Sequence, residues 1–214
     1  MQGRAGQGSG FRPGRCRAVS LAFLLALALA SAPVPAGVAL PTAERVRILE
    51  PARPVGDFEL TGQDGQPFRF ASLAGRPVLV AFGFTSCPDI CPTILGNLKM
   101  LRSVHGEALA ETAVVFISVD GARDTPERLA AFLGHYSPEF IGLTGTSDEV
   151  QRVASRFRAV FYPERPDPAT GHYNVAHSVQ VFAVDRRGRL RAEYHNASLD
   201  AMATVTRALV SESP

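Results

Sequence analysis

Pro77-Val-Leu-Val-Ala-Phe-Gly-Phe-Thr-Ser-Cys-Pro-Asp-Ile-Cys-Pro92 is the stretch that decides the fold of this 214-residue chain. Its first eight residues, Pro77–Phe84, form a continuous apolar run, which predicts a strand buried on both faces of a sheet. Two cysteines separated by three residues follow directly, and apolar residues at helical spacing begin at Ile94. The stretch therefore predicts a strand, a tight turn that carries two thiols, and a helix.

Prolines restrict the backbone around both cysteines. Pro92 disfavours a helical conformation at Cys91 and suits the first helical position, so we expect Cys91 to be the N-cap of the helix. Unpaired backbone N–H groups and the helix dipole at that end would favour the thiolate form of both cysteines. Thiolates on such a turn either bind a soft metal ion or exchange disulfides, so Cys87 and Cys91 are also the predicted redox-active pair of an oxidoreductase.

The rest of the chain alternates between strand and helix patterns. A turn at Gln63–Gln66 between two short alternating segments predicts an N-terminal hairpin. Further strands are predicted over Ala113–Val119, Ser178–Val184 and Arg189–Tyr194, and further helices begin near Thr125, Ser147 and Ser198. This order predicts an α/β fold with a mixed central sheet and flanking helices. The proline-rich stretch Pro163–Tyr173 is predicted to be a surface loop.

The first 36 residues have the character of a signal peptide or an N-terminal membrane anchor. Four arginines precede Ala18–Ala32, a run without charged residues that ends in small residues suited to cleavage. Because a membrane span needs about 20 apolar residues, this run is short for an anchor, and both alternatives stay open. Either one exports the following domain, to the periplasm or the periplasmic face of the inner membrane in a bacterium. We predict a linker over residues 37–54 and one domain over residues 55–214.

The basic formal charge of the chain comes from this leader. Of the 22 basic residues, four precede the apolar run, so 18 basic side chains stand against 20 acidic ones in the rest of the chain. Those 18 are scattered and form no basic run. The sequence therefore gives no indication that the chain binds nucleic acid.

A metal ion held by Cys87 and Cys91 needs at least a third ligand. The three-residue gap between the cysteines is wider than that of thioredoxin-type motifs, which favours chelation. His177 directly precedes a predicted central strand and is the preferred third ligand, with His172 as its rival. Two thiolates and one imidazole suit Cu(I) or Cu(II), whereas zinc would require a fourth ligand, such as Asp89 or water. The remaining histidines, His105, His135 and His195, are predicted to be surface residues.

Several blocks of the sequence, in this order, resemble the Sco/SenC proteins. They are Phe82-Gly-Phe-Thr-Ser-Cys-Pro-Asp-Ile-Cys-Pro-Thr93, Phe116-Ile-Ser-Val-Asp120, Arg123-Asp-Thr-Pro126, Ile141-Gly-Leu-Thr-Gly145 and His177-Ser178. The resemblance implies a thioredoxin-like fold and a copper chaperone for cytochrome c oxidase assembly, with Cys87, Cys91 and His177 as the copper ligands. It implies subunit II of the oxidase as the partner, with its CuA site as the destination of the copper. Other copper chaperones and thioredoxin-like reductants are further candidate partners.

Two positions depart from the family pattern. The chain has Gly121-Ala122 where the family usually has Pro-Glu, and Ala176 where the family usually has Asp before the His-Ser pair. The second change removes a carboxylate from beside the predicted ligand His177, which raises the question of what orients that histidine. The residues favour a metallochaperone over an enzyme. A thiol–disulfide oxidoreductase that uses the same cysteines stays open as the alternative.

Overall fold

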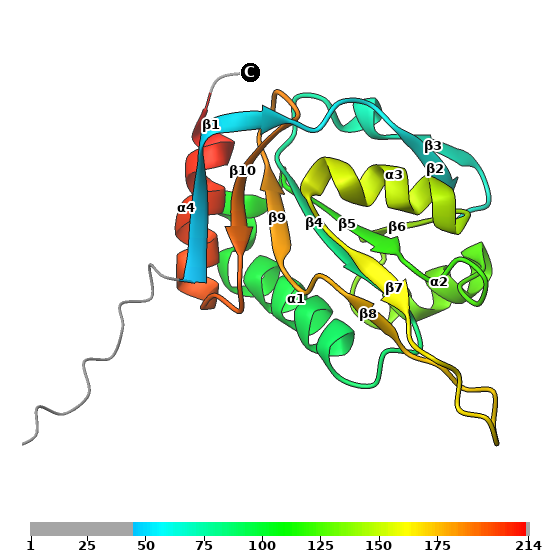
Figure 1. The fold of residues 1–214 in the computed structure, drawn as a ribbon. Coiled ribbons are helices and arrows are strands. Elements are labelled where there is room, and N and C mark those ends of the chain that lie inside the picture. Colours follow the sequence, from blue (N-terminus) through cyan, green and yellow to red (C-terminus); the bar gives the residue numbers. More distant parts are fainter. Residues whose placement is uncertain (1–44, 213–214) are drawn as a thin grey trace, which may run out of the picture. The chain divides into compact units, whose positions relative to one another are not determined.

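The fold is organised around an eight-stranded mixed sheet flanked by helices (Figure 1). The computed structural model describes residues 45–212. The signal peptide or anchor predicted over residues 1–36 lies outside the described residues. Within residues 45–212, none of the helices combines the length and the hydrophobicity that a membrane span requires.

Three parallel strands form the centre of this sheet, and antiparallel strands extend it on both sides. In their order across the sheet, the strands are β1 (Val46–Pro54), β10 (Arg189–Tyr194), β9 (Val181–Val184), β4 (Val78–Gly83), β5 (Ala113–Ser118), β6 (Ile141–Thr144), β2 (Glu59–Gly62) and β3 (Pro67–Arg69). Every residue of β4 and β5 is buried, as their apolar runs predicted. The predicted mixed sheet and the predicted hairpin, β2–β3, are both confirmed.

Within residues 45–212, four α-helices accompany the sheet: α1 (Ile90–Leu109), α2 (Pro126–Gly134), α3 (Ser147–Phe157) and α4 (Leu199–Ser211). Thr125 caps α2 and Pro126 occupies its first turn, which agrees with the helix start predicted near Thr125. Ser198 caps α4 in the same way, because its side chain accepts a hydrogen bond from the backbone N–H of Ala201. Helix α3 begins with a capping box between Thr146 and Glu149.

The prediction of a linker over residues 37–54 is wrong for Val46–Pro54. These residues form β1, which pairs with β10 in a register that shifts between Ile48 and Arg53. The prolines in this segment are typical of a linker, so the sequence pattern did not indicate a strand. An edge strand tolerates proline because one of its sides needs no hydrogen-bonded neighbour. Leu49 is the one buried residue of the strand, so no apolar alternation was visible.

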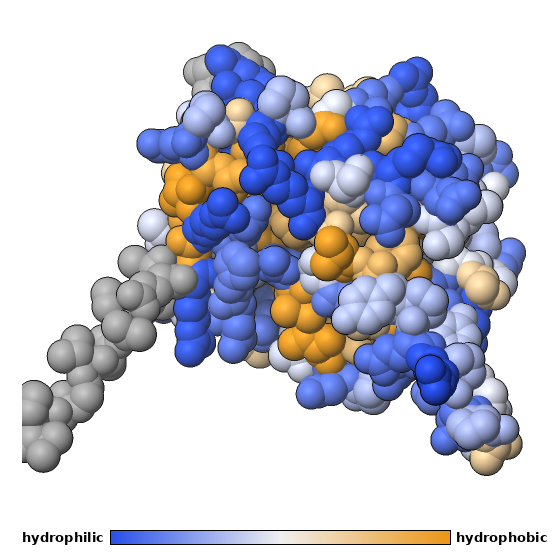
Figure 2. Space-filling model, viewed as in Figure 1, coloured by the Kyte–Doolittle hydropathy of each residue, from blue (hydrophilic) through white to orange (hydrophobic). Residues whose placement is uncertain are grey.

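The strand predicted over Ser178–Val184 begins only at Val181. The residues before it form β8 (Val175–His177), which pairs with β7 (Phe161–Pro163) in a separate two-stranded sheet. The predicted surface loop connects these two strands and extends away from the rest of the domain (Figure 1). Its surface is mostly hydrophilic (Figure 2). We call residues 161–177 the β7–β8 arm; its last residue is His177.

Candidate metal centre

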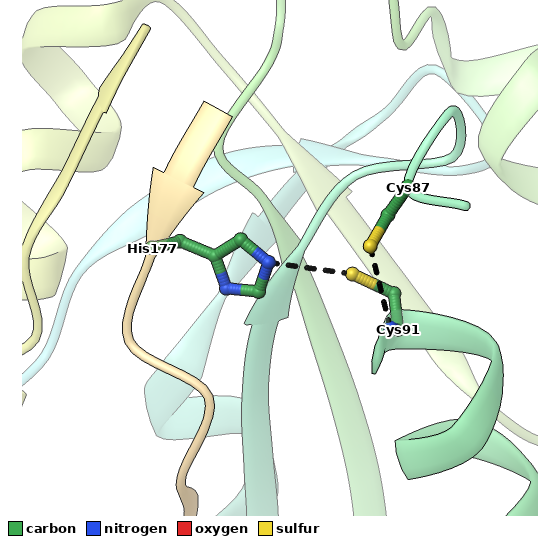
Figure 3. A group of neighbouring side chains, drawn as sticks. All are labelled: Cys87, Cys91 and His177. Atoms are coloured by element: carbon green, nitrogen blue, oxygen red, sulfur yellow. Dashed lines mark hydrogen bonds between the residues drawn. The ribbon is translucent and has the colours of Figure 1, made fainter. Parts of the chain in front are cut away.

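Cys87, Cys91 and His177 lie together in the fold (Figure 3). One ligand atom from each residue lies within 4.8 Å of those of the other two. The Nε2 atom of His177 is 3.5 Å from the sulfur of Cys91, although 86 positions separate the residues in the sequence. Two thiols and an imidazole are soft and borderline ligands, so this donor set fits a copper ion better than Mg²⁺ or Ca²⁺.

The turn between β4 and α1 positions the two sulfurs. Cys87 directs its backbone N–H to the carbonyl of Phe84 at 3.2 Å, which closes a turn at the end of β4. The sulfur of Cys87 then accepts a hydrogen bond of 3.4 Å from the backbone N–H of Cys91. Helix α1 begins at Ile90 with Asp89 at the N-cap, so the prediction that Cys91 is the N-cap is wrong. Cys91 lies in the first helical turn, where a proline at the next position is still tolerated.

The protonation of Cys91 also differs from the expectation. Its side chain is 1% exposed, and this burial raises the pKa of the Cys91 thiol well above its ordinary value. The hydrogen bond with Cys87 raises this pKa further. Without a bound cation, desolvation therefore outweighs the helix N-terminus, and Cys91 is a neutral thiol at neutral pH.

His177 is held in one tautomer. Its Nδ1 atom lies 2.9 Å from the carbonyl oxygen of Ser178. A carbonyl oxygen can only accept, so Nδ1 carries the proton and the lone pair is on Nε2, facing Cys91. Burial lowers the pKa of His177, while the Ser178 carbonyl partly opposes that shift. The imidazole is therefore neutral at neutral pH and can donate its lone pair to a metal ion.

The hydrogen bond between His177 and the Ser178 carbonyl shows what orients the histidine in a chain that has Ala176 in place of the usual aspartate. Ala176 pairs with Tyr162 across the β7–β8 arm, and adjacent residues of a strand point to opposite faces. A carboxylate at position 176 would thus point away from the face that bears the His177 ring. In this chain the Ser178 carbonyl orients the histidine instead, which is the function usually served by a carboxylate or carbonyl behind a metal-binding imidazole.

The other candidate ligands lie apart from the three. His172, the rival of His177, is exposed in the loop of the β7–β8 arm. Asp89 is exposed at the start of α1. In residues 45–212, neither belongs to a group of converging metal-binding side chains. The remaining histidines are exposed or, for His105, packed beside Arg207 and Asp200.

Two further residues support the site, Gly83, which was not singled out from the sequence, and Asp124, whose pairing with Arg123 in the sequence predicts a turn near the site. A Cβ atom on Gly83 would lie 2.7 Å from the sulfur of Cys91, so the absence of a side chain there makes room for the sulfur. Asp124 is fully buried and accepts hydrogen bonds from the backbone and hydroxyl of Thr85 and from the hydroxyl of Ser118. It thereby fixes the start of the cysteine turn. The glycine within the apolar run was the available signal for Gly83, and Arg123-Asp124 belongs to one of the sequence blocks that resemble the family.

Comparison with known proteins identifies the family of this chain. A sequence model of the SCO1/SenC family matches residues 47–211. The chain belongs to the SCO1/SenC family. An SCO2-like protein of Rickettsia conorii is 35% identical over 156 residues, which cover 72% of this chain and 76% of the relative.

Solved structures of family members share the fold. The copper-bound structure of yeast Sco1 is 31% identical with a TM-score of 0.67, covering 76% of this chain and 91% of the yeast chain. The copper-bound structure of Bradyrhizobium japonicum ScoI is 30% identical with a TM-score of 0.65, covering 72% and 98% of the two chains. These similarities confirm the predicted thioredoxin-like fold.

Proposed function

We propose that this protein is an exported copper chaperone that holds a copper ion with Cys87, Cys91 and His177. The observation that carries the proposal is the convergence of two sulfurs and a neutral imidazole nitrogen within 4.8 Å. Family membership supports the choice of metal, since two relatives with the same fold have been solved with copper bound. Export rests on the character of residues 1–36.

The proposed recipient is the CuA site of subunit II of cytochrome c oxidase, as the family resemblance implies. Three ligands leave a metal ion open to a further ligand from a partner, which is the starting point for transfer by ligand exchange. Large apolar side chains flank the site in the sequence and are exposed: Ile90, next to Cys91, is 36% exposed, and Val179, two residues after His177, is 46% exposed. Exposed apolar residues beside a polar site suit contact with another protein.

Metal analysis of the reduced protein tests the ligand set. We expect one copper ion per wild-type chain and at least about tenfold weaker Cu(II) binding by His177→Ala, since a lost ligand costs more than 1.4 kcal/mol of binding free energy. His172→Ala is the matched control, because that histidine is exposed on the same arm, and it should bind copper like the wild type. Full copper affinity in His177→Ala would refute the proposal.

Delivery is tested by incubating the copper-loaded protein with a copper-free soluble domain of subunit II and separating the two. We expect copper to leave with the subunit II domain. Retention of all copper by the chaperone, under conditions where the recipient binds free copper, would contradict delivery to this partner.

A thiol–disulfide oxidoreductase is the second candidate function. Both cysteines are free thiols with their sulfurs close together, which is the arrangement that a dithiol reductant requires. In such a reaction the two thiols become a disulfide, and the disulfide of a partner takes up the two electrons and two protons. A reduced chain that leaves an oxidised subunit II domain unchanged, by thiol counting, would remove this candidate.

A further inference from the structure

His177 is not itself a residue of the main sheet. His177 ends β8, and among the strands of residues 45–212 the sole partner of β8 is β7, in the two-stranded sheet. An isolated pair of strands is marginally stable by itself. The base of the arm packs through the buried side chains of Phe161 and Val175, but non-directional apolar contacts permit small shifts of an arm. Directional contacts are needed to fix an imidazole to the accuracy of a metal–ligand bond.

Arg123, in the loop between β5 and α2, supplies such contacts to the arm. Its Nη1 atom donates a hydrogen bond of 2.9 Å to the carbonyl of Tyr173, and its guanidinium carbon lies 3.7 Å from the centre of the Tyr173 ring. The Tyr173 hydroxyl donates to Asp120 at 2.9 Å, and Asp120 also pairs with Arg123. One residue of the arm is thus bound to the β5–α2 loop by hydrogen bonds from both its backbone and its side chain.

The same guanidinium reaches toward the metal centre. Its carbon lies 5.7 Å from the centre of the Phe84 ring, within cation–π range. The edge-to-face partner of that ring is the imidazole of His177, with ring centres 5.8 Å apart and an angle of 90° between the planes. Phe84 also provides the carbonyl that binds the backbone N–H of Cys87. Arg123 therefore lies between the two segments that must meet for the three ligands to converge.

One donor of this arginine adds nothing to stability. Its Nη2 atom is buried and has no hydrogen-bond partner among the described residues. A buried donor without a partner costs free energy, and such groups in native proteins call for an explanation other than stability.

We propose that Arg123 is a positioning residue for His177, which holds the β7–β8 arm against Phe84 so that Nε2 faces the two sulfurs. The proposal rests on the proposed function, because it takes His177 to be a copper ligand. Arg123 itself does not touch the ligand atoms in this arrangement. Its effect on copper should therefore be transmitted entirely through the histidine.

A double-mutant cycle on the full chain tests this transmission. Cu(II) affinity and the electron paramagnetic resonance spectrum are measured for the wild type, Arg123→Met, His177→Ala and the double variant. Methionine keeps much of the apolar length of arginine but removes its charge and hydrogen bonds. We expect Arg123→Met to weaken Cu(II) binding by about tenfold and to shift the spectrum toward that of His177→Ala. In the His177→Ala background, the same substitution should change the affinity by less than about twofold.

Arg165→Met is the matched control, because Arg165 is an exposed arginine in the loop of the same arm. It should retain wild-type affinity and spectrum. Arg123→Lys keeps the charge but loses the planar group that stacks on Tyr173, so it should give an intermediate affinity. The lysine variant can complete the cycle if the methionine variant does not fold, as judged by circular dichroism.

The outcomes separate the two proposals. Full affinity in His177→Ala refutes the ligand set and with it the role of Arg123. Weakened binding in His177→Ala together with unchanged binding in Arg123→Met and Arg123→Lys refutes the positioning role alone. An equal loss from the Arg123 substitution in both backgrounds also refutes it, because the effect would then not pass through His177.

Discussion

The imidazole of His177 directs Nε2 at the sulfur of Cys91 from 3.5 Å, while its Nδ1 proton is bound by the carbonyl of Ser178 at 2.9 Å. In the metal-free protein, Nδ1 carries the proton of the ring, so Nε2 can act only as an acceptor toward the thiol of Cys91. A bound metal ion would replace the proton of that thiol between the same two atoms. This contact therefore already brings two of the three candidate ligand atoms together. Because a metal ion competes with protons for both the thiol and the imidazole, metal binding should depend on pH.

Copper binding should release protons at neutral pH. Burial raises the pKa of Cys91, so its thiol is protonated in the reduced metal-free protein and must lose that proton to bind a metal ion. We expect at least one proton to appear per copper ion bound at pH 7, measured by titration in a weakly buffered solution with a pH indicator. Cys91→Ser, which lacks the thiol, should release less. Equal proton release from both proteins would contradict the assignment.

The stability of the metal-free protein should fall as the pH falls below about 6.5, the ordinary pKa of histidine. Burial lowers the pKa of His177 in the folded state, so the unfolded chain binds this proton more readily than the folded chain. The stabilisation from neutral His177 is present above the unfolded pKa and is lost below it. Urea unfolding at pH 7.5 and pH 5 should show a larger loss for the wild type than for His177→Gln. Equal losses in the free energy of unfolding for the two proteins would contradict the lowered pKa of His177.

Gly83→Ala should disturb the metal centre directly. The new Cβ atom would lie 2.7 Å from the Cys91 sulfur and equally close to the ring of Phe116, and both side chains are buried. We expect a loss of about 1–3 kcal/mol in the free energy of unfolding, as for other overpacked cores, together with weaker copper binding. Gly96→Ala is the matched control, because no atom lies within 4 Å of the added Cβ in the middle of α1. It should stabilise the helix by about 0.5–1 kcal/mol, and similar behaviour of the two variants would refute the argument.

Asp124→Ala should destabilise the protein even though this residue is not a ligand. The substitution leaves the backbone N–H of Thr85 without its acceptor and breaks two hydroxyl hydrogen bonds in a buried position. A loss of about 2–4 kcal/mol in the free energy of unfolding is expected, measured by urea unfolding at pH 7. Asp148→Ala, at an exposed acidic position in the first turn of α3, should cost at most about 1 kcal/mol. A comparable loss in both variants would contradict the role assigned to Asp124.

Local sequence patterns predicted the central part of the fold because these patterns are strong there. The apolar runs of β4 and β5 are continuous, and the caps of α2 and α4 have the side chains that such positions prefer. Strand β1 escaped prediction because its pairing partner is β10, more than a hundred residues away, and only Leu49 is buried. The pairing of β7 with β8 escaped for the same reason, since three-residue strands carry no readable alternation.

The sequence by itself determined the nature of the site: two cysteines on a strand-to-helix turn, one preferred histidine, and a family resemblance strong enough to suggest copper. Only the tertiary structure decided that His177 and not His172 lies beside the cysteines. The reason is that the distance from each histidine to the cysteines depends on how the β7–β8 arm packs. It also decided that Cys91 is a protonated thiol, since burial is a property of the packed core. The tautomer of His177 depends likewise on the carbonyl of Ser178, whose direction follows from backbone geometry and not from side-chain identity.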